Sequence, residues 1–159
     1  MCHNKVIMAL TDKQSILIEK LGLEYERNGM SPIEARIIAL LLVSDETELT
    51  FDQIRELLSI SKSATSNAIN ILLKVQQIEY ITKPGDRKRY FTSRVRNWEN
   101  DAKTRLMEML KSNEILKEVL AQRTENTPEF NKSLQEIVEF MEFLQKEMIV
   151  IFDKWQHRT

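Results

Sequence analysis

The sequence predicts a mainly α-helical protein that carries one small β-hairpin and ends in long helices. Three observations favour this fold class. The 159 residues include only three glycines and three prolines, a composition that favours long uninterrupted helices. Helix-start signals precede several amphipathic segments. Two runs of β-forming residues, separated by one short glycine-containing loop, are typical of a hairpin.

The first helix is predicted to begin at a capping box. Thr11 is the expected cap and Gln14 the residue that bonds back to it. The helix should run to about Asn28, where Gly29 stops it because glycine tolerates the left-handed conformation at a helix end. We expect this N-terminal segment, residues 1–30, to join the core or a dimer interface.

The second helix has the strongest start signal in the chain. Ser31 is placed to cap it, Pro32 suits its first turn, and Glu34 is positioned to bond back to the cap. The segment is apolar nearly all round by Val43. We therefore expect it at the centre of the core.

The third and fourth helices form a predicted helix-turn-helix. Thr50 and Gln53 make another capping box, which opens a short helix that ends near Ser59. Ser61 can cap a fourth helix, which runs to about Gln76. Two helices joined by a turn of about three or four residues are the helix-turn-helix arrangement, although this spacing alone is weak evidence.

The fourth helix has two contrasting faces. The predicted apolar face comprises Ala64, Ala68, Ile71, Leu72 and Val75. The opposite, polar face comprises Lys62, Ser63, Ser66, Asn67, Asn70 and Lys74. A merely solvated face normally mixes charges of both signs, whereas this one contains no Asp or Glu. A helix that enters a DNA groove must exclude carboxylates and offer short donors and acceptors to base edges, so the pattern favours nucleic-acid binding.

The segment after this helix is predicted to form a β-hairpin. Residues 80–82 and 89–92 are the expected strands, and Pro84-Gly85 suits the centre of a type II turn. A hairpin that follows such a helix is a wing. Its cations are placed to reach the DNA backbone or minor groove: Lys83, Arg87, Lys88 and Arg89. Asp86 is expected to anchor a neighbouring arginine, with an exposed turn residue as the alternative.

Charge is strongly segregated along the chain despite a net charge of −1. Residues 61–96 carry eight basic and two acidic side chains, a sum of +6. The flanking segments, residues 1–60 and 97–159, sum to −4 and −3. A basic patch in an acidic protein is the usual electrostatic signature of a polyanion partner, and a solvated face without a partner is the alternative.

These motifs resemble the MarR superfamily, and most closely its GbsR-type branch of winged-helix transcriptional regulators. The resemblance covers roughly residues 15–100 and rests on residues 29–45 (GMSPIEARIIALLLVSD), 61–68 (SKSATSNA) and 83–91 (KPGDRKRYF). It implies a homodimeric, sequence-specific DNA-binding regulator, commonly a repressor that answers a small ligand. By position, the groove-reading residues of the family correspond to Lys62, Ser63, Ser66 and Asn67, and its wing-tip arginine to Arg87. Thr65 departs from the family, which often has an apolar core residue there.

The last third of the chain carries two heptad patterns. The longer pattern repeats at alternating spacings of four and three: Phe130, Leu134, Ile137, Met141, Leu144, Met148, Ile151 and Trp155. The shorter one comprises Ala102, Leu106, Met109, Asn113, Leu116 and Leu120. Such seams indicate packed helices, either within one chain or across a dimer. One helical hairpin can hardly bury all of this apolar surface, so we expect residues 97–159 to form a dimerisation region.

No catalytic, cofactor-binding or metal-binding constellation is recognisable, so we expect that the chain is not an enzyme. His3 and His157 lie at opposite ends, and Cys2 is the single cysteine. The longest apolar runs, such as Met148–Phe152, are far shorter than the roughly 20 residues that span a bilayer. With no signal peptide and no disulfide pair, the chain is expected to be cytoplasmic.

Together these features predict a DNA-binding domain over residues 31–96. The helix at about 61–76 would enter the major groove, and the wing at 83–89 would contact the backbone or the minor groove. A two-fold dimer holds its two recognition helices at a fixed separation. The operator should therefore be a near-palindrome with half-sites about 10 bp apart. The alternative is a winged-helix protein–protein interaction module whose basic surface binds an acidic protein partner.

Overall fold

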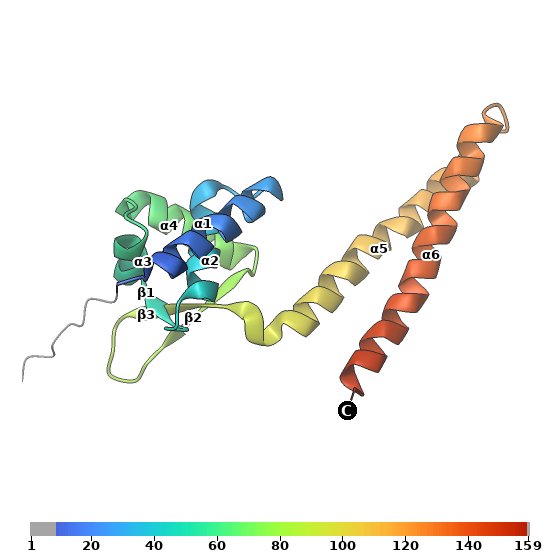
Figure 1. Cartoon of the computed structure of the whole chain (residues 1–159). Helices are drawn as coiled ribbons and strands as arrows, with labels where there is room; N and C mark the ends of the chain where they lie inside the picture. Colours follow the sequence, from blue (N-terminus) through green and yellow to red (C-terminus); the bar gives the residue numbers. More distant parts are fainter. Residues whose placement is uncertain (1–8, 159) are drawn as a thin grey trace, which may run out of the picture. The chain divides into compact units, whose positions relative to one another are not determined.

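The structure, a computed structural model, describes residues 9–158 and contains two compact units, Met1–Arg96 and Asn97–Thr159 (Figure 1). The first unit has helices α1 (Asp12–Arg27), α2 (Pro32–Val43), α3 (Phe51–Leu57) and α4 (Lys62–Lys74), and strands β1 (Leu49–Thr50), β2 (Ile78–Thr82) and β3 (Arg89–Ser93). After the 3-10 turn η1 (Arg94–Asn97), the second unit has α5 (Trp98–Gln122) and α6 (Pro128–Gln156). The mainly α-helical winged helix-turn-helix fold is confirmed. No helix within residues 9–158 is long and apolar enough to cross a membrane.

Two of the three predicted capping boxes form. At α1 the amide of Gln14 donates to the Thr11 hydroxyl, and the Gln14 side chain accepts from the Thr11 amide. At α3 Thr50 and Gln53 make the same pair of bonds. Gly29 follows α1 with a φ of +92°, as expected of a residue that ends a helix.

The start of α2 differs from the prediction. Ser31 is the residue before the helix, but its side chain makes no capping hydrogen bond, so the predicted capping box with Glu34 is wrong. Pro32 occupies the first turn and has no amide hydrogen. The helix start therefore has one unsatisfied donor fewer, which reduces the need for a side-chain cap.

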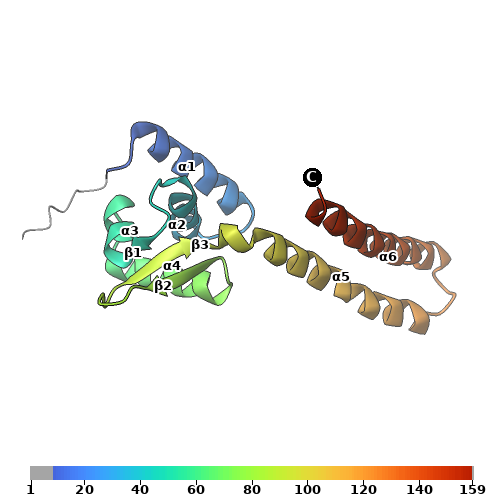
Figure 2. The same ribbon diagram turned by 90° about the horizontal axis from the view of Figure 1, so that it is seen from below.

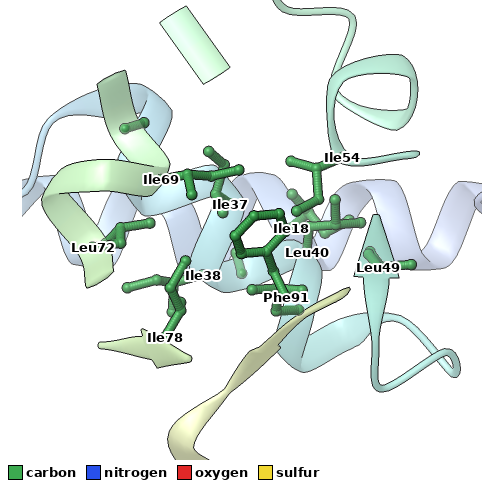
Figure 3. Packing of buried hydrophobic residues seen from close by; sticks show 13 residues of the cluster. Ile18, Ile37, Ile38, Leu40, Leu49, Ile54, Ile69, Leu72, Ile78 and Phe91 are labelled. Carbon is green, nitrogen blue, oxygen red and sulfur yellow. The ribbon is translucent and has the colours of Figure 1, made fainter. Parts of the chain in front are cut away.

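The core of the first unit surrounds α2, as its apolar sequence predicts. Ile37 and Leu40 of α2 are fully buried, and side chains from every other element of the unit pack around them (Figure 3). The labelled neighbours in this cluster include Ile18, Leu49, Ile54, Leu72, Ile78 and Phe91. This shared core fixes α3, α4 and the sheet relative to one another.

The sheet is antiparallel, with strand order β1-β3-β2. β2 and β3 form the predicted hairpin (Figure 2), and Tyr80 pairs with Phe91 across it. β1, which the sequence analysis did not predict, adds to the free edge of β3 and pairs Thr50 with Tyr90. Since Thr50 is also the residue that caps α3, the hairpin is joined directly to the start of the helix-turn-helix.

The buried face of α4 differs from the predicted one. Thr65, Ala68, Ile69 and Leu72 are buried, whereas Ile71 and Val75 are 45% and 52% exposed. The predicted apolar face is therefore wrong for Ile71 and Val75, and it omitted Ile69. In Figure 3 Ile69 and Leu72 point toward α2 residues Ile37 and Ile38, so contact with α2 determines the face that is buried.

The second unit is an antiparallel hairpin of α5 and α6 (Figure 2). Its buried residues are Leu110 and Asn113 on α5 and Leu134, Val138 and Phe152 on α6. The sequence left open whether these helices pack within one chain or across a dimer. In the structure α5 and α6 pack against each other within one chain. Asn113 is 2% exposed, and its side-chain amide donates to the Val138 carbonyl at 3.1 Å.

Candidate nucleic-acid interface

The polar face of α4 is open to solvent. Five of the six predicted residues are exposed and the sixth, Ser66, is half-buried; the exposed ones are Lys62, Ser63, Asn67, Asn70 and Lys74. α4 contains no acidic residue anywhere along its length. The face therefore offers only hydroxyl, amide and ammonium groups, which are suited to base edges and phosphates.

The start of α4 is held by two hydrogen bonds to Ser61, whose hydroxyl also lies within hydrogen-bond distance, 3.2 Å, of the Ser63 hydroxyl on the polar face. The Ala64 amide donates to the Ser61 hydroxyl at 3.2 Å, which caps the helix as predicted. Thr65 is fully buried, and its hydroxyl donates to the Ser61 carbonyl at 2.8 Å. The polar atom of Thr65 is thus satisfied within the core, so a threonine can replace the apolar residue that the MarR resemblance leads us to expect.

The tip of the hairpin has the turn that the sequence predicts. Pro84 and Gly85 occupy the central positions, and the Asp86 amide donates to the Lys83 carbonyl at 3.0 Å. Gly85 has a φ of +80°, the value that a type II turn requires at its third position. Arg87 and Lys88 follow directly and are exposed.

α4 and the wing border one groove of about 370 Å³. The lining residues come from the start of α3, from α4 and from the wing: Thr50, Phe51, Asp52, Ser66, Ile69, Asn70, Leu73, Arg87, Lys88, Arg89 and Phe91. Of the predicted residues, Ser66 and Asn70 of α4 and Arg87, Lys88 and Arg89 of the wing line this groove, whereas Lys62, Ser63, Asn67, Lys74 and Lys83 do not. This juxtaposition is what a helix in the major groove and a wing on the adjacent backbone require.

The four predicted wing cations are not equivalent. The side chains of Arg87 and Lys88 form no ion pair with any residue that the structure describes. Arg89 lies over the Tyr80 ring, 4.7 Å from its centroid. Lys83 is paired with Glu48 at 2.9 Å, and this contact raises the pKa of Lys83. Lys83 is therefore the wing cation that an ion pair within the described residues engages, whereas Arg87, Lys88 and Arg89 form no such pair.

Asp86 has a different partner from the one the sequence suggested. Its carboxylate accepts a hydrogen bond from the Tyr90 hydroxyl at 2.6 Å and from the Lys88 amide at 2.9 Å. These two bonds lower the pKa of Asp86, and the same contact raises the pKa of Tyr90. Asp86 therefore anchors the wing from within, through a tyrosine rather than an arginine.

Six lining residues were not among the predicted site residues, and three of them lie around the start of α3: Thr50, Phe51 and Asp52. The capping box identified Thr50 as a helix start, but only its pairing with Tyr90 brings it beside the wing. Asp52 is the one acidic residue that lines the groove; its side chain is 69% exposed and lies 3.9 Å from Arg55. No local pattern in the sequence signals these long-range neighbours.

The predicted dimerisation residues of α6 divide into two groups. Leu134 is buried against α5, and Met141, Leu144 and Met148 are half-buried. The other four remain exposed in the single chain, with exposed fractions of 39–58%: Phe130, Ile137, Ile151 and Trp155.

Among residues 9–158 no three His, Cys, Asp or Glu side chains lie close enough to hold a metal ion. Cys2 and His3 lie outside the described residues.

The fold and groove define the class of the protein as a winged helix-turn-helix. Residues 28–89, which include the helix-turn-helix and most of the wing, match the model of the MarR family, so the resemblance to that family is confirmed over this segment. The chain is 20% identical over 142 residues to the HTH-type transcriptional regulator MmpR5 of Mycobacterium tuberculosis (strain ATCC 25618 / H37Rv), which covers 89% of this chain and 86% of that protein.

A solved structure described as a transcriptional regulator has the same fold. Its TM-score with this chain is 0.73 at 18% identity, and the match covers 92% of this chain and 99% of that one. The match to the MarR family and the similarity to the curated transcriptional regulator bear out the prediction that the chain is not an enzyme.

Proposed function

We propose that the protein is a homodimeric DNA-binding transcriptional regulator. Its recognition helix, α4, enters the major groove, and the wing at residues 83–89 contacts the backbone or the minor groove. The observation that carries this proposal is the single groove shared by Ser66 and Asn70 of α4 and by Arg87 and Lys88 of the wing. The match to the MarR family over residues 28–89 supports the same function.

Electrostatics give the proposal a measurable consequence. Each phosphate that a cation neutralises releases counterions, so the logarithm of the binding constant falls with the logarithm of salt by about 0.9 per contact. Arg87 is exposed and has no ion pair in the described structure, so it is free to make such a contact. Arg87→Ala should weaken DNA binding and make the slope shallower by about one unit.

The matched control is Lys111→Ala. Lys111 is an exposed cation on α5, in the other unit, so its loss changes net charge equally without touching the groove. Both variants are titrated with salt against a DNA duplex selected from a random pool. A slope and affinity for Arg87→Ala equal to those of the control would remove the wing from the mechanism.

Base recognition is tested separately on α4. Asn67 is exposed on the polar face, and an amide side chain reads adenine in the major groove through paired hydrogen bonds. Asn67→Ala should reduce the preference for the selected duplex over a random one. Equal losses on both duplexes would contradict a base-reading role. Salt-resistant binding to an acidic protein, with no retention of duplex DNA, would favour the alternative of a protein-interaction module.

The dimer is proposed on the exposed apolar side of α6. Besides Phe130, Ile137, Ile151 and Trp155, this helix exposes Phe140 and Phe143 by 56% and 57%. Several large apolar side chains exposed on one helix mark an interaction site, and a second copy is the economical partner for it. Ile137→Lys should give a sedimentation mass near the 18.7 kDa of one chain.

Gln135→Lys is the control for the dimer test. It adds the same charge two positions away, roughly 200° around the helix from Ile137. A monomeric wild type, or equal dissociation of both variants, would contradict the proposed interface. Three finer features also belong to the proposal. The GbsR-type branch and a repressor that responds to a small ligand come from the sequence resemblance, and a cytoplasmic location comes from the cysteine content and the lack of a recognisable signal peptide.

A further inference from the structure

Four residues form one connected set of contacts around the turn of the wing, which we call the wing brace: Glu48, Lys83, Asp86 and Tyr90. We propose that Lys83 and Tyr90 are positioning residues, which hold the wing so that Arg87 and Lys88 reach DNA, and that Lys83 is not itself a DNA contact. The inference rests on the proposed DNA-binding function and assigns a role within it that the sequence did not reveal.

The contacts of the brace close a ring across the hairpin. The Lys83 ammonium lies 4.1 Å from the centroid of the Tyr90 ring. The Tyr90 hydroxyl donates to Asp86 at 2.6 Å, and the Asp86 amide donates to the Lys83 carbonyl at 3.0 Å. Lys83, Asp86 and Tyr90 are therefore each held from two sides. An exposed ion pair or cation–π contact is weak by itself. When several contacts order the same turn, however, the conformational-entropy cost of ordering it arises only once.

The brace also ties the wing to the helix-turn-helix. Glu48, whose carboxylate lies 2.9 Å from the Lys83 ammonium, directly precedes β1. β1 pairs Thr50 with Tyr90 and leads without a break into α3. The hairpin is thus fixed at its side chains as well as its backbone to the strand that begins the helix-turn-helix.

The brace separates the cations of the wing into two roles. Lys83 would have to leave Glu48 before it could neutralise a phosphate, and the raised pKa of Lys83 reflects the same contact. Arg87 and Lys88 form no such ion pair within residues 9–158. Asp86 accepts from the Lys88 amide at 2.9 Å, so the brace acts directly on the backbone that presents these two side chains.

Glu48→Ala should change the affinity for DNA in opposite directions under the two possible roles of Lys83. If Lys83 contacted DNA, removing its competing carboxylate would free the ammonium and strengthen binding. If the brace positions the wing, the same change loosens the turn, and binding to a selected DNA duplex should weaken by about two- to fivefold. The salt slope should stay unchanged, because the number of phosphate contacts in the complex is the same.

Glu46→Ala is the matched control. Glu46 is an exposed carboxylate in the same loop and forms no ion pair within residues 9–158. Removing its carboxylate measures how much the affinity for DNA rises simply because this loop has lost one negative charge. Lys83→Arg, which keeps both the charge and a group that stacks on Tyr90, should bind as the wild type does. Binding by Glu48→Ala as tight as by Glu46→Ala, or a salt slope for Lys83→Met that is shallower by about one unit, would overturn the proposal.

A second measurement needs no DNA. Tyr90→Phe keeps the ring but removes the hydroxyl that holds Asp86. In the free protein, hydrogen exchange at the Lys88 amide should become several-fold faster, while exchange at buried α2 amides stays the same. Unchanged exchange at Lys88 would refute the brace. A wild type that binds no duplex would refute the proposed function instead, and the exchange rates would still show whether these contacts order the wing.

Discussion

The rotation of α4 about its own axis decides which of its residues face the groove, and two isoleucines on this helix test it. Ile69 is 3% exposed and Ile71 is 45% exposed, although only two positions separate them. Truncation to alanine removes the same atoms from the same helix in both cases. Ile69→Ala leaves a cavity in the core and should cost about 2–5 kcal/mol of unfolding free energy.

The expected cost at Ile71 is much smaller. About half of this side chain already meets water, so the loss of apolar burial is about half of the 1.5–3 kcal/mol for a fully buried isoleucine. The higher helix propensity of alanine returns a few tenths of a kcal/mol. Ile71→Ala should therefore cost less than about 1 kcal/mol.

Urea unfolding followed by far-UV circular dichroism measures both variants. Tryptophan fluorescence is unsuitable because both tryptophans, Trp98 and Trp155, lie in the second unit. Equal m-values would show that the variants differ in stability and not in the surface exposed on unfolding. A cost at Ile71 that matches or exceeds the cost at Ile69 would refute the observed rotation of α4, and with it the placement of Ser66 and Asn70 in the groove.

Three further predictions concern the turn, the hairpin and acid stability. Gly85→Ala should lower the free energy of unfolding in urea by about 1 kcal/mol. No atom of another residue, its two chain neighbours aside, lies within 4 Å of an added Cβ, so the whole cost comes from the positive φ, and an unchanged stability would contradict that conformation. Asn113→Leu should raise the thermal midpoint of the tryptophan signal, because the side-chain oxygen of Asn113 is buried without a hydrogen-bond partner; a lower midpoint would show that its bond to α6 matters more. Lys117 lies 2.7 Å from Glu142 and lowers the pKa of Glu142. This ion pair therefore contributes to the free energy of unfolding above the unfolded pKa of about 4.3, and the contribution is lost as pH falls through the folded pKa. Wild type and Lys117→Met should therefore differ in midpoint near neutral pH and converge in acid, and a constant difference would contradict the pair.

Local signals in the sequence predicted the features that depend on neighbouring residues. The capping boxes at Thr11 and Thr50 form, and so does the Pro84-Gly85 turn. In each case the interacting groups are within three or four positions of one another, so the sequence itself specifies the geometry. The polar face of α4 was predicted for the same reason, since helical periodicity alone places its residues.

Features that depend on distant residues were missed. β1 has only two residues, too few for a periodic pattern, and exists because Leu49 lies opposite Phe91. The error at Ile71 has a similar cause: periodicity shows that α4 has an apolar side, but α2 determines which edge of it is buried. Glu48 contacts the wing through Lys83, which is 35 positions away.

The heptad pattern on α6 shows why a sequence repeat can predict a helix correctly without identifying the surface against which that helix packs. The helix has apolar residues on two adjoining lines. One runs through Leu134, Val138 and Phe152 and is buried against α5, while the other runs through Ile137 and Ile151 and remains exposed. The predicted seam took residues from both lines, because a period of 3.5 fits either when apolar residues are this dense.

The division of the chain separates its two proposed activities. Every residue of the groove belongs to the unit Met1–Arg96, whereas the exposed apolar line of α6 belongs to Asn97–Thr159. A second subunit would therefore add no base contact to the first. Its contribution to affinity would come from effective concentration, since one bound half-site holds the other recognition helix near its own. Dimerisation would then determine the spacing of the half-sites, and α4 with the wing would determine what is read within each one.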